Sequence, residues 1–191
     1  DLRAFLEEQV RLLERTLPEH IALTFFCDPE TYIVNADPTR LQQAFMNLAT
    51  NARDAMPNGG ELHISLKHLH LDKHLPPSAQ KLPPELTPGE WIQVTLADTG
   101  GGIPESILPH LFEPFYTTKA PGRGTGLGLS QVYGIIRQHE GYIDVHTEPD
   151  KGTTFFLYLP ALIAPASESR PLPMEHLLAG QGQMILIVED N

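Results

Sequence analysis

The sequence predicts a fold that mixes amphipathic helices and apolar strands along one chain. Apolar residues recur at helical spacing in three long segments, 1–17, 38–56 and 127–139. Between and after these segments lie stretches typical of strands, and the last two are joined by a short turn, as in a hairpin. With 191 residues, 41% hydrophobic and 19% charged, the chain can form one domain of ordinary size plus additional segments.

The chain is expected to open with a helix and two strands. In residues 1–17, leucine, phenylalanine and valine recur at helical spacing with charged residues between them, and Pro18 ends the helix. Residues 21–27 are rich in Phe, Thr and Ile and are predicted to form a strand. After a turn at 28–30, residues 32–35 are predicted to form a short second strand.

A long second helix is predicted to begin at Asp37, an acidic N-cap residue followed by Pro38 at the first helical position. It is expected to run to about Met56 and to end at the Pro-Asn-Gly-Gly sequence of residues 57–60. Its core-facing residues are predicted to be Leu41, Phe45, Leu48, Ala49, Ala52 and Ala55.

Three polar residues, Asn47, Asn51 and Asp54, share one face of this helix because they stand at positions i, i+4 and i+7. An asparagine offers one carbonyl oxygen and one amide group, which suits a metal or phosphate ligand. The alternative is that both asparagines simply face solvent, and on the evidence of this helix alone that alternative is favoured.

Residues 61–71 alternate as a strand and lead into a proline-rich insertion at 75–88, predicted to be a surface loop. His68, His70 and His74 near this boundary suggest a metal site. No cysteine or fourth ligand is spaced to complete a zinc site, so a solvated strand end is the favoured interpretation.

Two glycine clusters lie around a single acid in the middle of the chain. The predicted strand 91–98 ends in Asp98, and three glycines follow at 100–102. The second cluster consists of Gly122, Gly124, Gly126 and Gly128. Glycines let backbone N–H groups approach an anion, and a cluster that opens a helix presents the free N–H groups of the helix to a phosphate. The pattern predicts a pocket for a phosphorylated ligand whose other end donates to a carboxylate.

Two familiar phosphate-binding loops do not fit this spacing. A P-loop requires G-x-x-x-x-G-K-[ST], and no lysine follows a glycine in that arrangement. The dinucleotide motif G-x-G-x-x-G also fails, because Leu127 and Leu129 occupy the places where its last glycine would fall. The clusters therefore indicate a phosphate-binding loop of another design.

The second half of the chain is predicted to contain a short helix, an extended aromatic segment, part of a mobile lid, a third long helix and a hairpin. In order, these elements are 103–111, 112–119, 120–124, 127–139 and the paired strands 141–147 and 153–159, joined by the turn 148–152. Residues 162–183 have the composition of an interdomain linker. Residues 184–191, MILIVEDN, are predicted to be a buried parallel strand that begins a truncated second domain.

Composition narrows the class of protein. A formal net charge of −11 argues against nucleic acid as a partner, and a polyanionic ligand would need a metal and local cations. The apolar runs are far shorter than a membrane span and no signal peptide opens the chain, so no direct membrane contact is expected. A single cysteine, Cys27, excludes an internal disulfide and fits a reducing cytoplasm. The chain is expected to be cytoplasmic, or the cytosolic part of a membrane-bound sensor.

Five motifs occur in order between residues 47 and 155. They are NLATNARDA from Asn47, D-x-G-x-G-I from Asp98, FEPF from Phe112, G-x-G-L-G-L from Gly124 and G-T-x-F from Gly152. In this order they resemble the ATP-binding catalytic domain of sensor histidine kinases, within the wider gyrase, Hsp90, histidine kinase and MutL group. The final MILIVEDN resembles the opening of a response-regulator receiver domain, which would indicate a hybrid kinase.

The resemblance implies an α+β fold, a two-layer α/β sandwich of the Bergerat type. A mixed sheet would form one layer and three main helices the other, with ATP bound between the lid and the helices. The resemblance covers residues 1–161.

The resemblance also implies nucleotide-binding roles. Asp98 would accept a hydrogen bond from the adenine amino group, with Thr153 or Thr154 assisting directly or through water. Asn47 would bind Mg²⁺ through its side-chain oxygen, with Asn51 reaching the metal or the phosphates. The other implied ATP-binding residues are Asp54, Gly100, Gly102, Ile103, Lys119, Arg123, Gly124, Thr125, Gly126, Leu127, Gly128 and Leu129. Among these, Lys119 and Arg123 would neutralise phosphate charge, and the glycines would bring the backbone close to the nucleotide.

The implied reaction is transfer of the γ-phosphoryl group of ATP to a histidine, with Gln43 and Asn47 as the catalytic residues. ATP-hydrolysing members of the group have a general-base glutamate where this chain has Gln43, and glutamine cannot take a proton, so vigorous hydrolysis is not expected. The phosphoacceptor would lie in a dimerisation domain absent from this chain, because the one His-acid pair, His139-Glu140, is interpreted as structural. No autophosphorylation is therefore expected.

Two alternatives stay open. The domain could be a nucleotide-gated conformational or ATPase module of the same group, in which lid closure rather than phosphoryl transfer is the output. It could also be a scaffold that binds no nucleotide, although the intact glycine clusters argue against this. The expected partners are the phosphoacceptor domain and a receiver domain.

Overall fold

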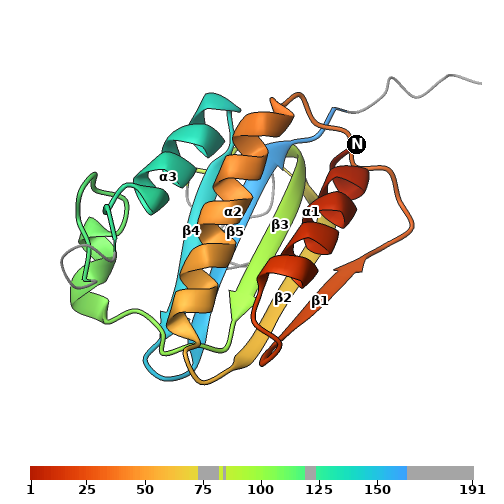
Figure 1. Ribbon diagram of the computed structural model, residues 1–191. Helices are drawn as coiled ribbons and strands as arrows, with labels where there is room; N and C mark the ends of the chain where they lie inside the picture. The colour runs from red at the N-terminus through yellow and green to blue at the C-terminus, as the bar shows by residue number, and fades with distance from the viewer. Residues whose placement is uncertain (73–81, 84, 119–123, 163–191) are drawn as a thin grey trace, which may run out of the picture.

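The computed structural model describes residues 1–72, 82–83, 85–118 and 124–162. Figure 1 shows three α-helices lying across one face of a five-stranded sheet. The helices are α1 (Leu2–Thr16), α2 (Pro38–Ala55) and α3 (Gly128–Gln138), and a short 3₁₀ helix, η2, spans Glu105–His110. The strands are β1 (Ile21–Cys27), β2 (Gly60–Leu71), β3 (Gly89–Asp98), β4 (Tyr142–Glu148) and β5 (Gly152–Pro160).

The sheet is mixed, in the order β1-β2-β3-β5-β4. β1 and β2 are parallel, and the other three pairs are antiparallel. β4 and β5 form the predicted hairpin, joined by the predicted turn. The α+β class and the two-layer sandwich with three main helices are thus confirmed.

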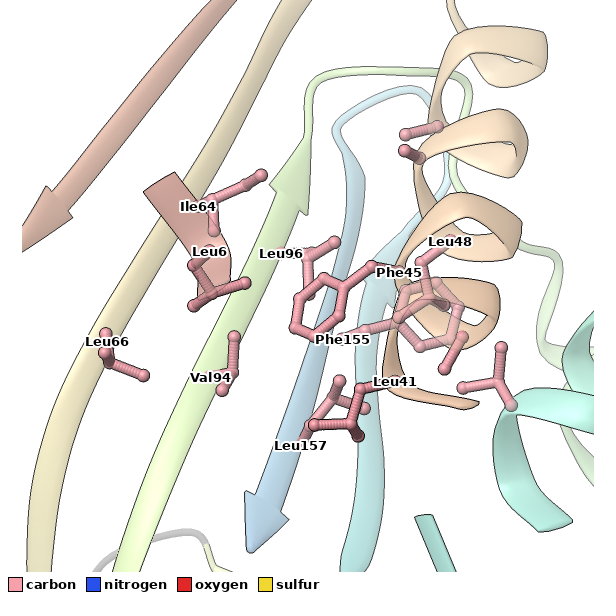
Figure 2. Packing of buried hydrophobic residues seen from close by; sticks show 14 of the residues in the cluster. Leu6, Leu41, Phe45, Leu48, Ile64, Leu66, Val94, Leu96, Phe155 and Leu157 are labelled. Carbon is pink, nitrogen blue, oxygen red and sulfur yellow. The ribbon is translucent and has the colours of Figure 1, made fainter. Parts of the chain in front are cut away.

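The main hydrophobic core fills the space between the helices and the sheet. Figure 2 shows side chains from both layers pointing toward one another. The residues labelled there are Leu6 of α1, Leu41, Phe45 and Leu48 of α2, Ile64 and Leu66 of β2, Val94 and Leu96 of β3, and Phe155 and Leu157 of β5. The predicted apolar stripe of α2 is buried except for the half-buried Ala55, and Ala44 joins it.

The start of α2 forms as predicted. The Asp37 carboxylate accepts hydrogen bonds from the backbone N–H groups of Thr39, at 2.8 Å, and Arg40, at 3.2 Å, and Pro38 occupies the first turn. These bonds satisfy two of the N–H groups that lack a partner within the helix, and an N-cap of this kind contributes about 1 kcal/mol.

A second, smaller cluster lies on the sheet face away from the helices. Trp91 and Tyr158 are buried there against Leu86. The indole N–H of Trp91 donates to the carbonyl of Thr87 at 2.9 Å. The described part of the proline-rich insertion is therefore partly buried rather than simply a surface loop, because Leu86 covers the aromatic side chains on this face.

The strand predicted at 32–35 does not form. Val34 makes one isolated antiparallel bridge with Ala161, and the neighbouring carbonyls accept from elsewhere in the chain. The N–H of Leu2 donates to Tyr32 at 2.7 Å, and the N–H of Leu162 donates to Ile33 at 2.8 Å. The backbone carbonyls of Tyr32 and Ile33 therefore bind the start of α1 and the segment that follows β5, instead of forming a strand ladder.

The extended conformation predicted for residues 112–119 is wrong at residues 112–115. The short helix forms as η2, but residues 111–115 form successive turns. Phe115 has a φ of +67°, and its N–H donates to the carbonyl of Gly126 at 2.9 Å. This bond to the second glycine cluster favours a turned backbone over an extended one.

Several predictions fall on residues outside the described ranges: part of the lid with Lys119 and Arg123, the linker, and the strand at 184–191. Among the helices that the structure describes, none is long and apolar enough to cross a membrane.

Phe45→Ala is expected to lower the free energy of unfolding by about 3–5 kcal/mol, because it leaves a cavity between α2 and the sheet. Phe45 is 1% exposed, whereas Phe26 of β1 is 63% exposed, so Phe26→Ala is the matched control, with an expected loss within about 1 kcal/mol. Urea denaturation followed by circular dichroism measures both. Equal losses would contradict the assignment of Phe45 to the core.

Candidate functional site

The acid at the end of β3 is buried on the helix-covered side of the sheet. Asp98 lies on the same face of β3 as the core residues Leu96 and Val94, and it is only 8% exposed. Its carboxylate accepts from the N–H of Gly100 at 2.9 Å. Burial raises the pKa of Asp98 above the ordinary value of 3.8, and hydrogen bonds from the backbone of Gly100 and Thr153 oppose this shift. A buried carboxylate of this kind is poised to accept from a ligand donor.

Thr153 lies directly across from Asp98 in the β3–β5 ladder and is also buried. It shares its sheet face with the core residues Phe155 and Leu157, whereas Thr154 shares the opposite face with Phe156. Of the two threonines considered in the sequence, the strand alternation therefore places Thr153 on the face of Asp98.

Thr147 of β4, which sequence reasoning missed, joins these groups into a network. Its hydroxyl accepts from the N–H of Ile103 at 2.8 Å, donates to the carbonyl of Gly152 at 3.0 Å, and lies 3.1 Å from the hydroxyl of Thr153. Thr147 thereby holds the glycine segment that follows Asp98 against the β4–β5 hairpin. The sequence alone does not single out Thr147, because threonine is common in β-strands.

Three glycines around Asp98 are needed because the protein itself fills the space where a Cβ would lie. At Gly100 a Cβ would meet the Cβ and carbonyl of Ala55 at 2.7 Å. At Gly102, which has a φ of +71°, it would lie 2.2 Å from the carbonyl of Glu148, and at Gly152, 1.9 Å from that of Asp98. Close packing of the chain therefore accounts for these glycines, whether or not a nucleotide also passes over them.

A cavity opens beside the carboxylate. Its lining includes Asp98, Leu108 of η2, and Ile143, Val145 and Thr147 of β4. Polar and charged residues complete it and make it mixed in character, among them Asp144, His146, Glu148, Lys151 and the predicted site residue Thr154. On the sheet face of Asp98, the apolar side chains of Leu108, Ile143 and Val145 lie beside this one buried acceptor, and that part of the cavity suits a flat, largely apolar group that carries a hydrogen-bond donor. Ile103, implied by the resemblance to bind ATP, is half-buried, and its backbone N–H is bound to Thr147 of the β4–β5 hairpin.

Asn47 on α2 is held by α3. Its Nδ2 donates to the carbonyl of Gly128 at 3.3 Å and to the Oε1 of Gln131 at 3.2 Å. Gln43, one turn earlier on α2, donates from its Nε2 to the same Gln131 oxygen at 3.4 Å. The two residues expected to be catalytic therefore meet at one side chain of α3, and sequence reasoning missed Gln131.

Two further polar residues lie on this face of α2. Asn51 is half-buried, while Asp54 is exposed and pairs with Arg53, whose Nη2 lies 2.8 Å from its carboxylate. Asn47 and Asn51 thus stand one turn apart on one face of α2, as their spacing predicts, and the contacts of Asn47 place it beside the first turn of α3.

The second glycine cluster leads directly into α3. Gly124 and Thr125 are exposed, and the Thr125 hydroxyl accepts from the N–H of Leu127 at 3.4 Å. Gly126, with a φ of +67°, packs so tightly on Phe115 that a Cβ would lie 2.4 Å from its carbonyl carbon. By contrast, a Cβ at Gly128 would have about 3.9 Å to the nearest atom, in Asn47, and Leu129 is half-buried against the core.

The far end of α3 also binds α2. The Nδ1 of His139 must donate to the carbonyl of Ile135, 2.7 Å away, because a carbonyl can only accept. Its Nε2 therefore accepts, and it does so from the N–H of Asp37 at 2.9 Å. His139 is a neutral structural link between the C-terminus of α3 and the N-cap of α2, as its sequence position suggested.

The histidines considered as metal ligands make protein contacts. His68 stacks on the ring of Tyr32 at 4.7 Å and lies 3.0 Å from the carbonyl of Thr31. His70 forms an ion pair or hydrogen bond with Glu90, and His74 lies outside the described residues. Within the described ranges, no group of three or more His, Cys, Asp or Glu residues could hold a metal ion.

The residues of this site lie within the part of the chain that matches a known protein family. A family model described as histidine kinase-, DNA gyrase B- and HSP90-like ATPase matches residues 36–163, which contain Asn47, Asp98 and both glycine clusters. The chain belongs to this family.

Curated relatives point to one branch of it. Sensor kinase CckA of Brucella abortus is 37% identical over 200 aligned residues, which cover 100% of this chain and 21% of the relative. Sporulation kinase A of Bacillus subtilis is 37% identical over 133 residues, covering 70% of this chain and 18% of the relative. The chain thus spans about a fifth of the length of these relatives and is homologous to the ATPase catalytic domains of sensor histidine kinases.

Solved structures agree on the fold. The catalytic domain of the histidine kinase ThkA superposes with a TM-score of 0.66 and 29% identity, covering 84% of this chain and 92% of that one. The mycobacterial sensor histidine kinase MprB gives a TM-score of 0.65 at 23% identity, covering 84% of this chain and 96% of that one, and at that identity it supports the fold alone.

Burial of Asp98 predicts a specific pH dependence. Since its pKa is raised in the folded chain, the folded state holds this proton more tightly than the unfolded chain. The free energy of unfolding of wild type should therefore fall relative to that of Asp98→Asn as the pH rises from the ordinary aspartate pKa of 3.8 through the raised pKa of Asp98. Above the raised pKa, the difference between the two proteins should stay constant. Chemical denaturation of both proteins at a series of pH values measures this. A difference that is flat with pH, or that changes in the opposite sense, would contradict the burial of the charged form.

Proposed function

We propose that this chain binds ATP with Mg²⁺ and transfers the γ-phosphoryl group to a histidine on a phosphoacceptor and dimerisation domain of a sensor kinase. The observation that carries the proposal is the buried Asp98 carboxylate beside a cavity that Leu108 and Ile143 also line. This carboxylate is on the same side of the sheet as Asn47 and the glycine-rich start of α3. Homology to sensor histidine kinases supports it.

The base would bind at Asp98. An ionised carboxylate accepts a hydrogen bond from the exocyclic amino group of adenine. Guanine has a carbonyl oxygen at that position, so two acceptors would face each other without a donor. Thr153 is close enough across the ladder to assist directly or through water. Leu108, Ile143 and Val145 would contact the ring.

The phosphates would bind at the start of α3. The first N–H groups of a helix lack partners within the helix and carry its positive dipole end, and the glycines before Gly128 let the backbone approach an anion. Lys119 and Arg123, within the expected lid, would add positive charge. These cations matter because the chain has a net charge of −11.

Mg²⁺ would bind at Asn47. Both hydrogens of its amide nitrogen are used by Gly128 and Gln131, so its Oδ1 is the atom left to bind a ligand. A neutral oxygen is a suitable ligand for this hard cation, which would supply positive charge to the phosphates when bound. Asn51, one turn further along α2, would reach the metal or the phosphates.

The chemistry asked of this chain is positioning and charge neutralisation. In the transfer, an acceptor imidazole nitrogen forms a bond to the γ-phosphorus, the bond from that phosphorus to the bridging oxygen breaks, and ADP leaves with that oxygen. Gln43 can orient a donor or acceptor but cannot take a proton, and the imidazole nitrogen attacks with its own lone pair. Without an acceptor domain, the chain is not expected to phosphorylate itself.

We also propose that residues 1–161 form the catalytic domain, 162–183 a linker and 184–191 the start of a receiver domain, as in a hybrid kinase. The alignment with the Brucella relative covers the whole chain, including this tail, which supports a shared arrangement. A cytoplasmic location follows from this proposal, since ATP is its substrate.

Calorimetric titration of the chain with ATP and Mg²⁺ tests the nucleotide site. ATP is expected to bind and GTP to bind much more weakly. Asp98→Asn should lose about 10- to 100-fold in ATP affinity, which corresponds to one hydrogen bond to a charged group. The matched control is Asp150→Asn in the exposed β4–β5 turn, where φ is +59° and asparagine is well tolerated. Failure of folded wild type to bind ATP would favour a scaffold without nucleotide.

The output of the domain is tested with labelled ATP and an added phosphoacceptor hairpin from a sensor kinase. Label is expected on the histidine of the hairpin and not on this chain alone. Substitution of Gln43 by Glu supplies a general base and is expected to increase release of inorganic phosphate. ATP-driven dimerisation of this chain with no label on any hairpin would favour the nucleotide-gated alternative.

A further inference from the structure

Three amide side chains, those of Asn47, Gln131 and Gln43, form a line from the first residue of α3 across to α2 (α2 and α3 lie side by side in Figure 1). An amide group can be turned end for end with almost no change of shape, so each could present either its oxygen or its NH₂ group. What decides the orientation is the atom at the start of the line.

That atom is the backbone carbonyl oxygen of Gly128, which can only accept. The Asn47 atom 3.3 Å from it must therefore be the NH₂ nitrogen. The second hydrogen of this nitrogen points to Gln131 at 3.2 Å, so the Gln131 atom must be its oxygen. That oxygen then requires a donor from Gln43, whose nitrogen lies 3.4 Å away. One backbone carbonyl thus fixes the direction of all three amides.

We infer that Gln131 is a positioning residue for the metal and transfer site, an inference that rests on the proposed function. Its oxygen has two lone pairs, one used by Asn47 and one by Gln43, so it holds both NH₂ groups toward α3. The oxygens of Asn47 and Gln43 thereby take no part in these hydrogen bonds, which leaves the first for Mg²⁺ and the second to accept from a donor at the transfer site.

Sequence position alone does not reveal this role. Gln131 stands three residues after Gly128 on the first turns of α3, and it is separated from Asn47 by 84 residues. An apolar residue of similar length at this position would keep the helix but would leave Gln43 free to turn either way, and would leave one Asn47 hydrogen without a partner. The expected consequence lies in the metal-dependent part of nucleotide binding.

The test compares wild type with Gln131→Met, which keeps side-chain length and helix propensity but has no acceptor oxygen. ATP affinity is measured by calorimetry with Mg²⁺ and again in EDTA. The ratio of the two affinities is expected to fall about five- to thirtyfold in Gln131→Met, as for one or two neutral hydrogen bonds. Affinity in EDTA should change less than about twofold, because Asp98 and the base pocket are untouched.

Two further variants separate positioning from simple loss of structure. Gln138→Met, at an exposed glutamine on the last turn of the same helix, is the matched control and should leave the ratio unchanged. Gln131→Glu keeps acceptor oxygens at the end of the side chain and is expected to retain the Mg²⁺ dependence.

The outcomes are distinct. An unchanged ratio in Gln131→Met, or equal losses in Gln131→Met and Gln131→Glu, would overturn the role of Gln131 while leaving the proposed function intact. Absence of ATP binding by folded wild type would overturn the proposed function and this inference with it. A fall confined to Gln131→Met supports both.

Discussion

The structure depends on burying one carboxylate, that of Asp98, at the point where α2, β3, β4 and β5 meet. Removing a charge from water is costly unless it gains partners, and Asp98 gains backbone donors and a neighbouring threonine but no cation among the contacts that the structure describes. The glycines around it allow this enclosure, because a Cβ at Gly100 would strike the end of α2 and one at Gly152 would strike the backbone of Asp98 itself. Stability is therefore given up at one point of the core to keep an acceptor ready for a ligand.

The other half of the site depends on the pairing of α2 with α3. The two helices run antiparallel and are joined near both ends of α3, by Asp37 with His139 and by Asn47 with Gly128. Each link uses a backbone group whose role is fixed: an N–H that can only donate or a carbonyl that can only accept. Side chains bound to such groups inherit a defined orientation, so Asn47 is oriented by the same helix start that is proposed to receive the phosphates.

The sequence predicted the elements well because local signals agreed with the tertiary structure. Asp37 and Pro38 marked the start of α2, alternation marked β2, and composition marked β1. It failed at 32–35, where the carbonyls of Tyr32 and Ile33 accept from Leu2 and Leu162, far away along the chain. It also missed Thr147 and Gln131, since their roles arise from contacts with residues 44 and 84 positions away. The glycine clusters singled out Asp98 and the helix spacing singled out Asn47, and the resemblance then gave each a role. The sequence analysis left open which of Thr153 and Thr154 would lie beside Asp98.

The nature of the groups beside α3 also limits what this chain can do. Asn47, Gln43 and Gln131 are amides, which neither take nor release a proton, so within the described part of this cluster no proton transfer to the protein is available. A reaction that needs a base to activate water is poorly served there, whereas an imidazole that attacks with its own lone pair needs only a fixed phosphate and a neutralised charge. The line of amides that begins at Gly128 is therefore better matched to phosphoryl transfer onto a histidine than to hydrolysis of ATP.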